Sequence, residues 1–148
     1  MSQIFFFVFA VIAGTAMAIQ GSLNSVLGKI IGFWEATFVV HIIATLLVAI
    51  IIFIFSLNKG DFGNLVKAPW YTYIGGILNV IILYGVVVTI PELGVANATT
   101  LIIVGQVTTA VIIDHFGFWG LETVPFQWIK LVGMGLLALG ARLLLNMG

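Results

Sequence analysis

Five apolar segments of about twenty residues each account for most of this chain. They are expected at residues 3–27, 36–57, 70–90, 93–113 and 126–145. A helix rises about 1.5 Å per residue, so about twenty residues cross the roughly 30 Å hydrocarbon core of a bilayer. Runs such as Val48–Phe53 do not alternate in polarity, as the strands of an outer-membrane barrel would. The sequence therefore predicts an all-α integral membrane protein, with five transmembrane helices forming one domain over residues 1–148.

The composition requires lipid as the solvent. Hydrophobic residues make up 62% of the chain and charged residues 7%, against about 25% charged in soluble domains. The absence of cysteine excludes disulfides and thiolate metal sites, and zero formal net charge argues against nucleic acid as a partner. No sequence motif typical of catalysis is present. We therefore expect no enzyme activity, catalytic residue, metal or cofactor, and we expect membrane lipid and a small solute as partners.

Lysine and arginine residues are almost evenly divided between the two sides of the membrane. Five spans place the two termini on opposite sides, with Lys59, Lys67 and Lys130 on the N-terminal side and Lys29 and Arg142 on the other. Orientation is normally set by an excess of Lys and Arg in cytoplasmic loops. A difference of one cation predicts dual topology and an antiparallel homodimer of inverted copies. The alternative is that one lysine is enough to hold a single orientation.

Polar side chains at membrane depth are costly, so they mark where function is expected. The residues predicted to line a substrate-binding site are Gln20, Asn24, His41, Asn79 and Gln106. Gln20 and Asn24 are four residues apart and share a helix face, and an imidazole can handle protons near neutral pH. The alternative is structural, because Asn, Gln and His also hydrogen-bond membrane helices to one another. Most threonines are expected to bond the backbone of their own helix.

Acidic residues are placed at the ends of the predicted spans or in loops. Of these, Glu35 and Asp114 are the candidate coupling or gating residues. A transporter that exchanges protons for organic cations usually needs a carboxylate deep in the membrane, and no Asp or Glu lies near the centre of a span. A permanently cationic substrate is therefore not the default expectation.

Small residues recur at helical spacing in the first and fifth segments. Gly14 and Gly21 are a heptad apart, and so are Gly133 and Gly140. Helices in lipid associate through close backbone approach rather than through the hydrophobic effect. These glycines are predicted to form packing faces or a dimer interface. The alternative is that membrane helices are simply rich in glycine.

Several motifs together resemble a known family of membrane proteins. They are Ala18–Asn24 with Leu27–Gly28, then Pro69–Gly76, and finally Val104–Gln106 leading to Ile113–Gly117. Over essentially the whole chain these resemble the YdcZ-like family, the half-size, five-helix branch of the drug/metabolite transporter superfamily. The resemblance implies a bacterial inner (cytoplasmic) membrane protein and one half of a ten-helix inverted-repeat bundle. Members occur as dual-topology homodimers, as oppositely oriented pairs or as fused ten-helix proteins.

The related small multidrug resistance proteins differ from this sequence at a position that bears on proton coupling. They have four helices and carry a glutamate in the first, where this chain has Gln20. The resemblance therefore does not extend to proton-coupled drug antiport.

These observations predict a transporter subunit that moves a small solute by alternating access. In inverted-repeat transporters the binding site lies near the midplane between the halves. The main alternative is a non-transporting scaffold, or a heterodimer subunit inactive alone. A passive channel is less favoured, because the sequence shows no ring of like charges or recognisable filter.

Overall fold

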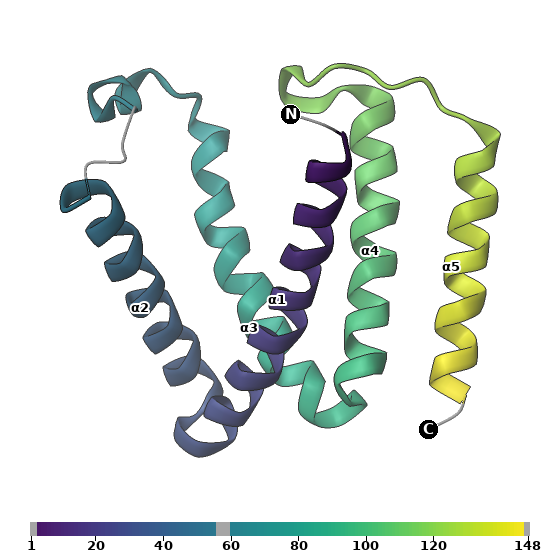
Figure 1. The fold of residues 1–148 in the computed structure, drawn as a ribbon, viewed down its shortest axis with the longest axis horizontal. Coiled ribbons are helices and arrows are strands. Elements are labelled where there is room, and N and C mark those ends of the chain that lie inside the picture. Colours follow the sequence, from purple (N-terminus) through teal and green to yellow (C-terminus); the bar gives the residue numbers. More distant parts are fainter. Residues whose placement is uncertain (1–2, 56–59, 147–148) are drawn as a thin grey trace. The chain divides into compact units, whose positions relative to one another are not determined.

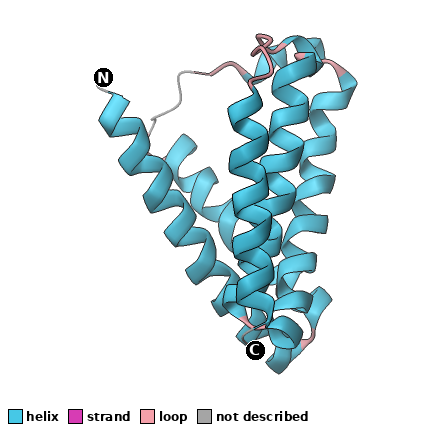
Figure 2. Ribbon diagram, turned by 90° about the vertical axis from the view of Figure 1, so that its right-hand side faces the viewer, coloured by secondary structure: helices cyan, strands magenta, loops and turns pink. Residues whose placement is uncertain are grey.

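The computed structural model describes residues 3–55 and 60–146, and five long helices dominate them (Figures 1 and 2). The long helices are α1 (Gln3–Ile31), α2 (Phe33–Phe53), α3 (Ile74–Leu93), α4 (Val95–Phe116) and α5 (Trp128–Asn146). Three short 3-10 helices complete the described elements: η1 (Phe62–Lys67), η2 (Trp70–Tyr73) and η3 (Phe118–Gly120). Each long helix, with η2 counted in the third span, is apolar and long enough to cross a membrane. The prediction of an all-α membrane protein with five spans is confirmed.

The first two helices meet at a single glycine rather than at a longer joint. The sequence predicted that the first helix ends near Leu27, yet α1 continues through Gly28 to Ile31. The break comes at Gly32, whose φ of 102° suits only glycine. α2 begins directly after it, three residues earlier than expected. The last two residues predicted for the second span lie outside the described residues.

The third and fourth spans also differ at their ends from the sequence prediction. The third begins as the 3-10 turn η2 after Pro69 and becomes α-helical only at Ile74. α3 then includes Pro91 in its last turn and ends at Leu93. Gly94, with a φ of 79°, separates it from α4. The positive-φ glycine, rather than the proline, therefore ends the helix.

The chain divides into two compact units. The first unit is Met1–Pro91 and contains α1, α2 and most of α3; the second is Glu92–Gly148 and contains α4 and α5. The prediction that the chain forms one transmembrane domain stays a prediction, as does the prediction that it is half of an inverted-repeat bundle.

In the first unit, the C-terminal half of α1 packs closely against its neighbours. A methyl group added at Gly21 would lie 2.9 Å from Cγ1 of Val86 on α3. One added at Gly28 would lie 2.6 Å from Cγ1 of Val87 and 2.7 Å from Cδ1 of Phe33. Real side chains do not approach this closely, so both glycines are needed for the helices to meet. The core of this unit lies at the crossing of α1 and α3, next to the start of α2.

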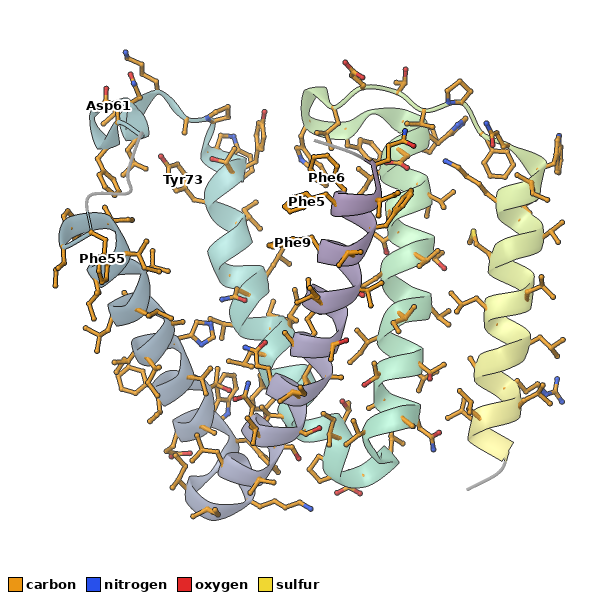
Figure 3. All side chains as sticks on the ribbon, in the orientation of Figure 1. Phe5, Phe6, Phe9, Phe55, Asp61 and Tyr73 are labelled. Carbon is orange, nitrogen blue, oxygen red and sulfur yellow. The ribbon has the colours of Figure 1, made fainter. Side chains whose placement is uncertain are left out.

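The N-terminal half of α1 presents an exposed aromatic surface. Phe5, Phe6 and Phe9 extend from it in Figure 3, and the rings of Phe5 and Phe9 stack with centroids 6.0 Å apart. Their exposed fractions range from 49% to 62%. Because water is a poor solvent for such a surface, we expect these rings to contact lipid or another protein chain.

The second unit is a pair of helices, α4 and α5, joined by an extended segment. α4 ends at Gly117, which adopts the left-handed conformation with φ 59°. The backbone N–H of Val124 donates to the carbonyl oxygen of Asp114 at 2.8 Å, which fastens the segment to the last turn of α4. Exposed aromatic side chains here include Trp119 and Trp128, residue types that favour the headgroup level of a bilayer.

Candidate functional site

Two of the predicted site residues contact each other in the first unit. Nδ2 of Asn79 on α3 lies 3.0 Å from Nε2 of His41 on α2. Nδ1 of His41 lies 2.7 Å from the carbonyl oxygen of Thr37, one turn earlier on α2. The hydroxyl of Thr37 in turn donates to the carbonyl oxygen of Phe33 at 2.9 Å. We call the facing sides of α2 and α3, which carry this hydrogen-bonded pair, the α2–α3 seam.

The hydrogen bonds of His41 fix where its proton is. A backbone carbonyl only accepts, so Nδ1 must carry the hydrogen that it donates to Thr37. Nε2 of the neutral ring is then an acceptor, and the amide of Asn79 is its donor. His41 is partly buried, whereas Asn79 is exposed. The pair therefore joins the two helices and leaves part of the Asn79 amide accessible.

An aromatic stack marks the seam closer to the α1–α2 turn. The rings of Trp34 and Tyr84 lie with centroids 4.1 Å apart and planes at 19°. Trp34 is seven residues before His41, and Tyr84 five residues after Asn79, so the two contacts are successive layers of the same antiparallel seam.

The candidate gating residue Glu35 lies at the start of α2. Its carboxylate folds back over Gly32, so that a methyl group added there would clash with Oε2. A negative charge in the first turn interacts favourably with the positive end of the helix dipole. This position gives Glu35 a structural role at the helix terminus, and a role in gating stays a prediction.

Asn24 is the most deeply buried of the candidate polar residues. Its exposed fraction is 6%, and its Nδ2 atom has no hydrogen-bond partner among the described residues. It lies on the same face of α1 as Gly21, Ser25 and Gly28, the closely packed face of the helix. Gln20, four residues before Asn24, is exposed instead. The structure therefore brings His41 and Asn79 together and leaves these two without a hydrogen bond to either.

Gln106 and Asp114 belong to the second unit. Gln106 is exposed on α4. The Asp114 carboxylate forms an ion pair with Lys130 on α5, with Oδ2 and Nζ 3.8 Å apart and side chains 48% and 28% exposed respectively. The sequence analysis named Asp114 as a candidate coupling or gating residue and did not pair it with Lys130. The carboxylate of Asp114 thus pairs with α5, while its backbone carbonyl accepts from the segment that precedes α5.

The glycines predicted as packing residues have different surroundings. Gly21 is closely packed, but a methyl group added at Gly14, Gly133 or Gly140 would meet no atom within 4 Å in the described part of the chain. Of the four glycines predicted as packing residues, Gly21 alone packs closely against other described residues. Whether the other three form a dimer interface stays a prediction.

Hydroxyl groups on the spans mostly bond their own helix. Thr15, Ser22, Thr37, Thr89, Thr100 and Thr108 each donate to the carbonyl four residues earlier. These bonds satisfy the hydroxyl without a neighbouring helix. The structural interpretation of these threonines is confirmed.

Comparison with known families decides what kind of protein this is. A family model described as "Putative inner membrane exporter, YdcZ" matches residues 5–143, nearly the whole chain. The chain belongs to the YdcZ family of inner membrane exporters. With its five membrane-length helices it is a multi-pass inner membrane protein, as the sequence motifs predicted. Comparisons with curated proteins and with solved structures found no significant match.

In this YdcZ-family protein, the connection between α2 and α3 is held by its own polar side chains. Asp61 accepts from Nδ2 of Asn64 at 2.9 Å, and Asn64 accepts from Nζ of Lys67 at 2.7 Å. The Tyr73 hydroxyl donates to the carbonyl oxygen of Leu65. Asp61 and Tyr73 are labelled in Figure 3. These bonds order the connection that follows the C-terminal end of α2.

A cavity of about 510 Å³ lies at this end of α2. It is lined by Ile52, Gly60, Asp61, Phe62, Asn64, Leu65 and Ala68. Its volume is in the range of small-molecule pockets. The sequence analysis did not predict this cavity.

The sequence prediction for this exporter also missed three contacts that shape the seam and the second unit. They are the Thr37 carbonyl that orients His41, the Trp34–Tyr84 stack, and the Asp114–Lys130 pair. The i−4 position of Thr37 could have suggested the first. The Trp34–Tyr84 stack and the Asp114–Lys130 pair each join two different helices, and no pattern within one helix predicts how two helices align.

Proposed function

We propose that this protein is a dual-topology transporter subunit that exports a small solute by alternating access, as an antiparallel homodimer. The membership of an exporter family supports transport. The proposal of an antiparallel homodimer rests on one observation. The chain combines five membrane-length spans with three cations on one side and two on the other. An odd number of spans gives inverted symmetry only if two copies insert in opposite orientations.

The proposed solute site includes Gln20, Asn24, His41, Asn79 and Gln106. Polar side chains of this kind inside a membrane span are costly unless they bind a partner. Asn79 is exposed and Asn24 keeps an unpartnered amide nitrogen, which supports a role beyond the packing of the chain itself. Glu35 and Asp114 are proposed as gate residues at opposite ends of their helices.

The exposed surface of the spans supports a partner in the membrane. In the most apolar window of each span, between 6% and 17% of the residues are buried. Gly14, Gly133 and Gly140 have room for close approach by another helix. An inverted copy of the chain, surrounded by lipid, is the proposed occupant of part of this surface.

Cysteine labelling in intact cells tests the topology, and the chain has no native cysteine to interfere. Single cysteines replacing Lys59 and Gly148 are each expected to react with membrane-impermeant reagent in about half of the molecules. Complete labelling at one site and none at the other would refute dual topology.

Release from proteoliposomes tests transport. Vesicles loaded with a small-molecule extract of cells are expected to lose specific solutes, in a protein-dependent manner that saturates with solute concentration. If no solute leaves faster than from protein-free vesicles, the transport proposal fails.

One observation favours a non-transporting scaffold as the second candidate. His41 and Asn79 hydrogen-bond each other, as residues that only join helices would. A scaffold predicts that the release experiment gives no saturable flux while the dimer still forms.

A further inference from the structure

Two polar groups of Asn79 remain available after it has bonded to His41. The amide has two N–H donors and one carbonyl oxygen. One N–H is used on Nε2 of His41, at 3.0 Å. The second N–H and the oxygen have no partner among the hydrogen bonds of the described residues. Asn79 is exposed, so an incoming molecule can reach its side chain.

His41 determines which groups Asn79 presents. Its Nδ1–H is held by the Thr37 carbonyl, so only the lone pair of Nε2 points towards Asn79. A lone pair must be met by the amide nitrogen and not by the amide oxygen. The Asn79 oxygen is therefore turned away from His41, and it remains available together with one N–H.

The seam around this pair carries no permanent charge. Between Ala36 and Phe53 on α2, and between Ile74 and Pro91 on α3, the sequence contains no Asp, Glu, Lys or Arg. Glu35 lies at the terminus of α2, and Tyr84 stacks on Trp34. An ion placed beside Asn79 would have no counter-charge on these helices and would lose its hydration. The seam is thus suited to an uncharged molecule.

We infer that Asn79, held in position by His41, binds the exported solute, and that this solute is uncharged and carries a hydrogen-bond donor beside an acceptor, as a carboxamide does. The inference rests on the proposed function, whose site it deepens. The donor of the solute bonds Oδ1 of Asn79, and its acceptor receives the remaining N–H. His41 belongs to this site as a positioning residue, and it acts on the solute through Asn79.

Four probe molecules that share a benzene ring distinguish the effect of charge on binding from the effect of hydrogen bonding. Benzamide is neutral with donor and acceptor, N,N-dimethylbenzamide lacks the donor, benzoate is an anion and benzylamine is a cation. Saturation-transfer NMR on the full chain in nanodiscs, with empty nanodiscs subtracted, measures their binding. We expect benzamide to bind about tenfold more tightly than the other three, since a lost hydrogen bond or an unpaired charge costs about this much.

Variants separate the solute contact from packing. Asn79→Leu is expected to weaken benzamide binding about tenfold, whereas the control Thr15→Val removes a hydroxyl that only bonds its own helix and leaves binding unchanged. His41→Phe is expected to weaken benzamide binding, and His41→Gln to restore part of it, because glutamine offers Asn79 an acceptor again. A merely structural histidine would not show this rescue.

Specific outcomes overturn the inference. Equal or tighter binding of benzoate or benzylamine refutes an uncharged solute, and unchanged benzamide binding in a folded Asn79→Leu variant refutes the role of Asn79. Absence of benzamide binding refutes the carboxamide-type solute. If vesicles nevertheless release other solutes in the extract experiment, only this inference fails; if they release none, the proposed function fails as well.

Discussion

Asn79 donates a hydrogen bond to Nε2 of His41 across the α2–α3 seam, at 3.0 Å. The two residues are 38 positions apart in sequence, and the bond joins the middle of two membrane-length helices. Nε2 can accept this bond because the hydrogen of the ring lies on Nδ1, which donates to the Thr37 carbonyl. A neutral, fully bonded imidazole can lie at membrane depth without a counter-charge, which an imidazolium could not.

Loss of either partner of this bond should destabilise the first unit. We expect His41→Phe and Asn79→Leu each to lower the free energy of unfolding by about 1 kcal/mol, the usual size of an interhelical hydrogen bond in a membrane. The double variant should be no worse than the worse single variant, because the same bond is lost in all three. Unfolding of the purified protein in mixed micelles measures this, with Thr15→Val as the control. Additive losses would show that the two side chains act independently.

The glycines on α1 give a prediction about close packing. Gly28→Ala should destabilise the protein by about 1–3 kcal/mol, because its Cβ would lie 2.6 Å from Val87 and 2.7 Å from Phe33. Gly76→Ala on α3 is the matched control, since its Cβ would meet no described atom within 4 Å. That variant should change the free energy of unfolding by less than about 0.5 kcal/mol. Equal effects of the two substitutions would contradict the close approach at Gly28.

The sequence predicts the five spans and identifies His41 and Asn79 as candidate polar residues, but it does not predict that these two residues contact each other. Segment length and apolar composition predict five helices, because crossing hydrocarbon leaves few alternatives. His41 and Asn79 stand out as polar residues at membrane depth. Their pairing depends on how α2 and α3 approach each other, which no periodicity within one helix encodes. The sequence also predicted that the first helix ends near Leu27, before Gly28. The residues packed against Gly28 belong to other segments, so the sequence of α1 alone does not show that Gly28 lies inside the helix.

Substitutions in the Asp114–Lys130 pair can show whether the Asp114 carboxylate has a structural role or couples transport. As a partly exposed ion pair it should contribute at most about 1 kcal/mol to stability. If the role is structural, Asp114→Asn and Lys130→Gln should have the same small effect on unfolding and on solute release. If Asp114 couples transport, Asp114→Asn should lower release at least about tenfold, while Lys130→Gln should not. Release from extract-loaded vesicles, compared at equal protein content, distinguishes the two results.

The distribution of cations predicts which substitutions change the orientation in which the chain inserts. The same substitutions test whether transport needs both orientations. Lys29→Gln leaves three cations on the N-terminal side against one, and should place that side in the cytoplasm. The combination Lys59→Gln, Lys67→Gln and Glu92→Lys leaves one against three and should do the reverse. Each biased variant should label from one side only and release little solute when expressed alone. Co-expression should restore release, because oppositely oriented copies can then pair. Full activity of either biased variant alone would show that the antiparallel dimer is not the transporting unit.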